Sequence, residues 1–196
     1  MNPVETVAAV LVLVSVYLST RENIWAWPTA IVAVALYAVV FWQTRLYAAV
    51  GLQACFLMIS VYGWYNWLYG GAERTVLRVT RLTRGVALSA LAVWAVGSTG
   101  LWYLLARHTD AVLPWLDSPV SVASLLAQWM LSRKILENWL IWVAANLCYI
   151  GMYWYLELWP TVVLYLVLLV LASKGYLDWR RSWRHTLGTP GAPLER

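Results

Sequence analysis

The sequence predicts an all-α integral membrane protein, with seven transmembrane helices arranged as two parallel three-helix repeats joined by one linking helix. Composition is the first observation: of the 196 residues, 62% are hydrophobic and 12% are charged, and the mean hydropathy is +0.65. A soluble domain this apolar would have too little polar surface to cover its core, so the bilayer is its natural solvent. The other two observations are a series of seven apolar stretches and an internal repeat at an offset of 112 residues.

A helix needs about 20 largely apolar residues to cross a bilayer. The seven stretches are residues 3–19, 24–42, 46–68, 85–106, 119–131, 139–156 and 158–177. We interpret the first as a span rather than a signal peptide. Its first charge is Glu5, no basic segment precedes it, and no small-residue cleavage site follows it.

Proline marks several of the predicted helix starts, where a missing backbone N–H costs little. Pro28 and Pro160 lie near the starts of the second and seventh stretches. The fifth stretch is the shortest, and the run from Asp117 to Pro119 predicts an N-cap followed by the first helical turn. The seventh contains Lys174, whose long stem we expect to reach toward the cytoplasm.

The repeat appears when the chain is aligned with itself at an offset of 112 residues, without a gap. Positions 21–67 and 133–179 then share 11 identities over 47 positions. Three are tryptophan pairs, which chance matches of apolar helices do not readily produce; they are Trp27 with Trp139, Trp42 with Trp154 and Trp67 with Trp179. Two odd-numbered bundles keep the same orientation only if one further helix crosses between them, so the sequence predicts a 3+1+3 arrangement with the substrate site at the repeat interface.

Basic residues give the predicted orientation. Eleven lie in segments on the side of the C-terminus, and only Arg45 and Arg107 lie on the other side. Cytoplasmic loops of membrane proteins are enriched in Lys and Arg, so we expect the N-terminus outside and the C-terminus in the cytoplasm. The net charge of +5 therefore reports topology, and no nucleic-acid surface is expected.

The predicted organisation has four parts. We expect residues 3–70 to form the first bundle and residues 71–107 a basic cytoplasmic loop with the linking helix. Residues 108–179 then form the second bundle, and residues 180–196 a short cytoplasmic tail. Cys55 and Cys148 fall within spans and are expected to be packing residues, in neither a disulfide nor a metal site.

Two aromatic and amide-bearing helix faces are the candidate substrate site. In the sixth stretch the face carries Trp139, Trp142, Asn146 and Tyr149. In the third stretch it carries Gln53, Ser60, Trp64 and Trp67, with Tyr62 beside it. Gln128 of the fifth stretch is a third buried amide. An interfacial belt remains the alternative for the tryptophans, and an interhelical hydrogen bond the alternative for Asn146.

The ligand that suits these groups is a flat heteroaromatic molecule with hydroxyl or amide groups. Rings supply stacking and amides fix orientation, while electron-rich tryptophan faces also favour a delocalised cation. An enzyme is not expected: His108 and His185 are predicted to lie in loops, and no nucleotide-binding or nucleophile motif occurs. We expect no cofactor and no metal.

At the level of motifs, the chain resembles the PnuC family of bacterial vitamin transporters. The resemblance rests on RLYAAVGLQACFLMISVYGWYNW, on SRKILENWLIWVAANLCYI and on LPWLDSPVSVASLLAQWMLSRK, and extends from about Trp25 to Trp183. It implies a fold similar to the SWEET sugar transporters and a place in the bacterial inner membrane. It also implies uptake of nicotinamide riboside by facilitated diffusion with alternating access, followed by trapping through cytoplasmic phosphorylation.

The resemblance also carries over residue roles. The W-x-x-W motif falls on Trp139 and Trp142, the glutamine of the third helix on Gln53, and the aromatic cluster on Tyr62, Trp64 and Trp67.

Several alternatives stay open. The substrate could be another vitamin, such as thiamine or riboflavin, because the motifs do not separate these. A sugar transporter of the same fold and a non-transporting ligand sensor or assembly subunit are the other functional classes. Besides the substrate and the lipid bilayer, the partners could include further copies of the chain.

Overall fold

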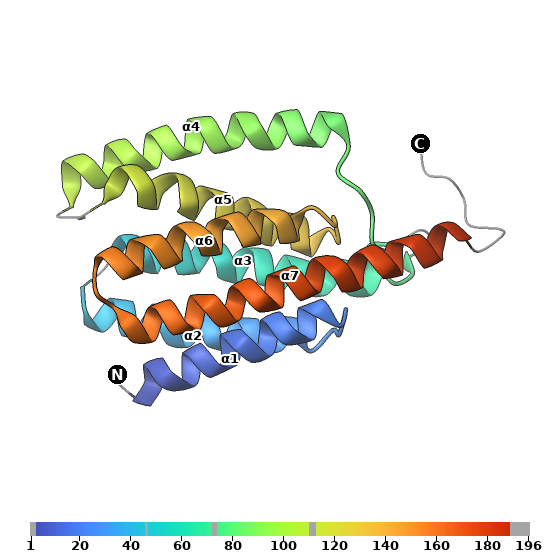
Figure 1. Ribbon diagram of the computed structural model, residues 1–196, viewed down its shortest axis with the longest axis horizontal. Coiled ribbons are helices and arrows are strands. Elements are labelled where there is room, and N and C mark those ends of the chain that lie inside the picture. Colours follow the sequence, from blue (N-terminus) through green and yellow to red (C-terminus); the bar gives the residue numbers. More distant parts are fainter. Residues whose placement is uncertain (1–2, 46, 72–73, 110–112, 189–196) are drawn as a thin grey trace.

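The computed structural model describes residues 3–45, 47–71, 74–109 and 113–188. Seven α-helices make up the fold (Figure 1), which confirms the predicted all-helical class. They are α1 (Pro3–Thr20), α2 (Ala26–Gln43), α3 (Tyr47–Tyr69), α4 (Arg84–His108), α5 (Pro114–Ser132), α6 (Asn138–Tyr155) and α7 (Trp159–Gly188).

Six of the helices form a closed ring. Along the chain α1 packs on α2 and α2 on α3, while α5 packs on α6 and α6 on α7. Contacts of α3 with α5 and of α1 with α7 join the two bundles. The helix α4 lies outside the ring and packs on α5, as Figure 1 shows. Because α4 crosses back over the length of the molecule, α5 runs in the same direction as α1.

The repeat at 112 residues is confirmed by the backbone. The bounds of α2, shifted by 112, coincide with those of α6, and the ends of α1 and α5 coincide in the same way. The left-handed residues also match: Glu22 and Lys134 have φ of 53° and 52°, and Arg45 and Glu157 have φ of 59° and 57°. The two bundles are therefore related by a pseudo-two-fold axis that runs along the ring.

The predicted start of the fifth helix is wrong. Helix α5 begins at Pro114, so Asp117 and Ser118 are not N-cap residues and Pro119 lies inside the helix. Local preference allows this start, because Pro114 fits the first helical position and Asp117 is favourable near the positive end of the helix dipole. Ser118 Oγ then donates to the Pro114 carbonyl at 2.7 Å, within the helix.

The seventh helix is longer than predicted. It continues from the apolar stretch through Leu177 to Gly188, across several arginines. Positive charge near a helix C-terminus is favourable, and no proline or glycine interrupts this segment before Gly188.

Hydropathy differs among the helices in a way that bears on function. Within the described residues, four helices are long and apolar enough to span a membrane by composition alone: α1, α2, α4 and α7. The helices α3, α5 and α6 are not among these four, and they carry most of the helical Asn and Gln side chains. Polar groups inside a membrane protein belong at helix interfaces, so these three helices are the ones expected to line a site.

Candidate substrate site

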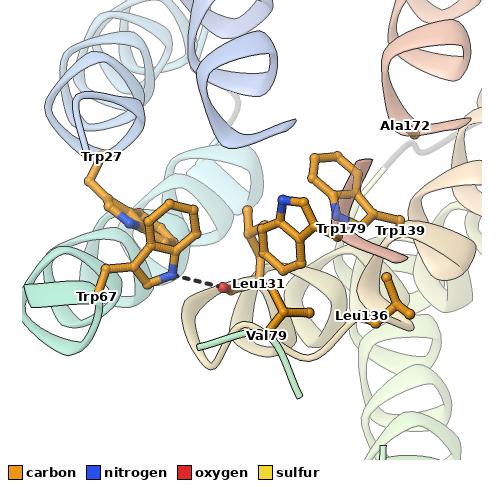
Figure 2. Packing of buried hydrophobic residues seen from close by; sticks show 8 residues of the cluster. All are labelled: Trp27, Trp67, Val79, Leu131, Leu136, Trp139, Ala172 and Trp179. Carbon is orange, nitrogen blue, oxygen red and sulfur yellow. Dashed lines mark hydrogen bonds between the residues drawn. The ribbon is translucent and has the colours of Figure 1, made fainter. Parts of the chain in front are cut away.

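Four tryptophans close one end of the ring. Trp27, Trp67, Trp139 and Trp179, here called the Trp quartet, are each at most 2% exposed. Trp27 meets Trp67 edge-on at 5.3 Å between ring centroids, and Trp139 meets Trp179 edge-on at 5.4 Å. Trp67 and Trp179 contact each other at 5.9 Å and occupy equivalent positions of the repeat. Equivalent residues that touch must lie on the symmetry axis, so the quartet (Figure 2) fills the centre of the ring.

Two glycines make room for the outer rings of the quartet. A Cβ atom on Gly63 would lie 2.4 Å from Cη2 of Trp27, and one on Gly175 would lie 2.6 Å from Cε2 of Trp139. These glycines are also repeat equivalents. Small residues let membrane helices approach closely, and here they let α2 press a ring onto α3, and α6 a ring onto α7.

Indole hydrogen bonds cross between the bundles at the quartet. Trp67 Nε1 donates to the Leu131 carbonyl at 3.0 Å (Figure 2), and Trp179 Nε1 donates to the Ser19 carbonyl at 3.0 Å. Each bond joins the last turn of the first helix of one bundle to an indole ring of the other bundle. Within the described residues, the buried Nε1 groups of Trp27 and Trp139 have no acceptor.

An ion pair lies next to the quartet. Lys134 Nζ donates to Glu22 Oε2 at 2.7 Å and sits 4.6 Å from the centroid of the Trp67 ring. The Lys134 side chain is 4% exposed and that of Glu22 is 25% exposed. A buried ammonium is costly unless it is paired, and here a carboxylate and an aromatic face compensate it.

The connection between α3 and α4 covers this end of the ring. Its residues 74–83, here called the strap, exchange backbone hydrogen bonds with the α5–α6 turn. Thr80 N donates to the Lys134 carbonyl and Leu136 N to the Thr80 carbonyl, each at 2.9 Å. The Glu137 carboxylate pairs with Arg81 and accepts from Leu82 N at 2.7 Å. The strap is therefore fixed to the second bundle by backbone and charge together.

The amides and hydroxyls lie one to two turns further into the ring. Gln128 Nε2 of α5 donates to Ser60 Oγ of α3 at 3.4 Å, across the bundle interface. Asn146 of α6 is 3% exposed, and Trp142, a turn before it, packs against the quartet. These four side chains, Ser60, Gln128, Trp142 and Asn146, form what we call the middle layer.

A tyrosine cluster fills the ring beyond the middle layer. The rings of Tyr149, Tyr153 and Tyr165 lie 4.9–6.0 Å apart, and the Tyr149 hydroxyl faces Ser121 and Asp117 of α5. The Asp117 carboxylate accepts from Ser121 Oγ at 3.2 Å. Helix α6 thus presents one face along the whole ring, from the quartet through Asn146 to these tyrosines.

Seven of the ten predicted site residues fall in the quartet, the middle layer or the tyrosine cluster, and three lie elsewhere. Trp67 and Trp139 belong to the quartet, and Tyr149 to the tyrosine cluster, while the middle layer contains the four side chains named above. Gln53 is half-buried in α3, at the position equivalent to Tyr165. Tyr62 and Trp64 lie on the outer surface of α3, 38% and 40% exposed. Their exposure favours the alternative of a lipid-facing belt.

Lys174 forms an ion pair with Asp178 one turn further along α7. It points toward the end of the ring that holds the quartet.

Sequence reasoning did not select the ion pair, the strap contacts or Tyr165 of the tyrosine cluster. The signal for the ion pair was present, because Glu22 and Lys134 fall opposite each other at the 112-residue offset. A comparison that counts identities passes over such a pair of opposite charges. The Asp117 carboxylate was hidden by the wrong helix start.

Known proteins resemble this chain over most of its length. A family profile described as nicotinamide mononucleotide transporter matches residues 2–181. The chain is 26% identical to the nicotinamide riboside transporter PnuC of Escherichia coli, over 92% of this chain and 86% of the relative. It is also 26% identical to the riboflavin/roseoflavin transporter RibM of Streptomyces davaonensis, over 73% of this chain and 68% of the relative.

A solved structure shares the fold. The crystal structure of the vitamin B3 transporter PnuC matches with a TM-score of 0.74 and 23% identity, over 94% of this chain and 84% of that chain.

Proposed function

The chain belongs to the nicotinamide mononucleotide transporter family, a group of membrane vitamin transporters and not enzymes, and from that premise we propose that it takes up nicotinamide riboside. Transport would be facilitated diffusion by alternating access, with the two bundles rocking about the axis of the ring. Phosphorylation in the cytoplasm would then trap the product. Neither step requires a cofactor bound to this chain.

The observation that carries the choice of substrate is the chemistry inside the ring. Aromatic rings, neutral amides and the Asp117 carboxylate line it, and its buried cation, Lys134, is already compensated by Glu22. Aromatic faces and a carboxylate attract a flat, delocalised cation such as the pyridinium of nicotinamide riboside. We propose that the ligand stacks on Trp142 and is oriented by Asn146, with Gln53, Ser60 and Gln128 as further polar contacts and Trp139 as the floor.

Binding of this ligand requires that one hydrogen bond between the bundles, the one from Gln128 to Ser60, be broken. Ser60 and Gln128 satisfy each other across the bundle interface, so a ligand group must replace that hydrogen bond. Buried amides left unpaired cost free energy, and a ligand that offers a hydroxyl or amide recovers it. A ribose hydroxyl or a carboxamide meets this requirement.

Calorimetric titration of the purified protein with nicotinamide riboside, thiamine and riboflavin tests the proposal. We expect saturable binding of nicotinamide riboside. The variants Trp142→Ala and Asn146→Ala should each weaken it about tenfold or more, which corresponds to about 1.4 kcal/mol, in protein that remains folded. Leu147→Ala is the matched control, because Leu147 neighbours Asn146 but is exposed. Unchanged dissociation constants in both test variants would reject the proposed site.

Riboflavin transport is the second candidate, supported by the similarity to RibM. Its isoalloxazine ring is flat and rich in hydrogen-bonding groups, but it is uncharged. Binding of riboflavin without nicotinamide riboside would select this candidate. In liposomes, either substrate should equilibrate without an ion gradient and accumulate only when a phosphorylating enzyme and ATP are enclosed.

The proposed orientation places the quartet and the strap at the cytoplasmic end. The support is the charge of the described residues at that end, where Arg21, Arg133 and the arginines of the strap and α7 gather. A reporter enzyme fused to the C-terminus, active only in the cytoplasm, tests this arrangement.

A further inference from the structure

The contacts at the quartet end of the ring are the ones that rocking must break. Between the bundles these are the Trp67–Trp179 contact, the two indole hydrogen bonds and the Glu22–Lys134 ion pair. Asn66 Nδ2 adds a hydrogen bond to the Ser132 carbonyl at 2.8 Å. Tryptophan packing and single hydrogen bonds do not depend on charge. The ion pair is therefore the one inter-bundle contact in this set that a charge reversal can weaken and a second reversal can restore.

The ion pair lies on the symmetry axis. Glu22 and Lys134 occupy equivalent positions of the repeat, with matching left-handed backbone, and they bind each other. Each follows the last turn of the first helix of its bundle, so separating the bundles at this end pulls the two groups directly apart. The Lys134 ammonium also rests on the Trp67 ring, which couples the pair to the quartet.

A solvent-accessible cavity beside the ion pair allows the two charges to separate and to pair again. This cavity, of about 480 Å³, opens outside the pair and is lined by Glu22, Lys134, Ser182 and residues 75–79 of the strap. Solvent in such a cavity can hydrate both charges when they separate. The desolvation that makes buried ion pairs costly to break is thus smaller on this side.

We propose that the Glu22–Lys134 ion pair is the latch of the cytoplasmic gate: it holds the quartet closed and must open each time substrate leaves the ring. The inference rests on the proposed transport function and goes beyond it, since neither residue belongs to the substrate site. Both are positioning residues. They set the equilibrium between closed and open states at this end and leave substrate affinity in the closed state unchanged.

Chemical accessibility tests the latch without any substrate. A cysteine replaces Ser60, which is fully buried, in a background where Cys55 and Cys148 are alanine. A membrane-impermeant, charged thiol reagent is applied from the cytoplasmic side. Glu22→Lys and Lys134→Glu each place like charges on the axis, so each should raise the rate of modification about tenfold, equivalent to 1.4 kcal/mol. The double variant restores an ion pair in the reverse sense and should return the rate to that of the parent.

Matched controls separate the latch from general effects of charge. Asp178→Lys breaks an ion pair at the same end, but one confined to α7, and should leave the rate unchanged. Glu22→Gln keeps the shape of the side chain and provides a milder variant if a reversal fails to fold; it should raise the rate in the same direction. Nicotinamide riboside titration of each latch variant, made in the protein with Ser60 intact, should show the dissociation constant of the unmodified protein.

Each outcome decides the matter. Single reversals that leave the rate unchanged, or a double variant that stays as accessible as the singles, would overturn the latch. If the protein with Ser60 intact binds no nicotinamide riboside, the proposed substrate fails, while the accessibility result still supports or rejects the latch.

Discussion

Replacing Gly63 by alanine tests the packing of the quartet. The new Cβ would lie 2.4 Å from Cη2 of Trp27 and 2.6 Å from both Cζ2 and Cζ3. Carbon atoms pack at about 3.5–4.0 Å, so the ring must retreat by roughly 1 Å or more. It cannot do so freely, because Trp67 stands edge-on against it and is itself packed on Trp179.

The expected cost follows from this geometry. Overpacking a filled core costs about 1–3 kcal/mol. For a chain of this length each kcal/mol lowers the melting temperature by about 2–4 °C, so we expect a fall of roughly 2–12 °C. Thermal unfolding in detergent, followed by intrinsic tryptophan fluorescence, measures it.

The control is on the same helix. A methyl group added to Gly51 of α3 would meet no neighbouring atom within 4 Å, so Gly51→Ala should leave the melting temperature unchanged or raise it slightly. Adding Trp27→Phe to Gly63→Ala should make the double variant less destabilised than the sum of the single changes, because the smaller ring vacates the contested space. Equal melting temperatures for Gly63→Ala and Gly51→Ala would refute the reasoning.

Three further changes have defined outcomes. Gly175→Ala should lower the melting temperature as Gly63→Ala does, whereas Gly151→Ala, with open space around it, should not. Asp117→Asn removes the carboxylate beside the tyrosine cluster and should weaken nicotinamide riboside binding about fivefold, or about 1 kcal/mol, in calorimetry. Binding of an uncharged ligand should not be weakened. An equal loss of affinity for the charged and the uncharged ligand would contradict the electrostatic role of Asp117. Glu137→Gln removes the charge that holds the strap, so trypsin should cleave at Arg81 several-fold faster in membranes with this face exposed, and an unchanged rate would argue against that role.

Much of the ring could be predicted because the identities that reveal the repeat include tryptophans, which are large and rare residues. The repeat pairs of Trp27 with Trp139 and of Trp67 with Trp179 already marked the four residues that the structure brings together, and the offset placed one crossing helix between the bundles. The predicted bounds of α1, α2, α3, α4 and α6 agree with the structure to within two residues, whereas the start of α5 and the end of α7 do not.

The orientation of individual side chains could not be predicted in the same way. Helix α3 carries aromatic residues on several faces, so spacing alone did not separate the inner stripe of Ser60 and Trp67 from the outer positions of Tyr62 and Trp64. Gly63 decides the matter, since only the face with the glycine admits the Trp27 ring. A contact that depends on a missing side chain gives no hydrophobic signal.

The start of α5 was predicted wrongly for a related reason. Two prolines compete for the first helical turn, and local preference does not rank Pro114 against Pro119. Packing decides: the Pro119 carbonyl accepts a hydrogen bond from Trp94 of α4, which holds the longer helix in place.

The charges on the axis also constrain how such a molecule can be assembled. Two identical half-molecules of three helices would bring the same residue to the axis twice, acid against acid or base against base. Opposite charges at one symmetric point require halves that differ, which here are Glu22 in one and Lys134 in the other. By joining them in a single polypeptide, α4 ensures that every acidic half meets a basic half in equal number and fixed orientation. Separately expressed halves should accordingly recombine only as unlike pairs.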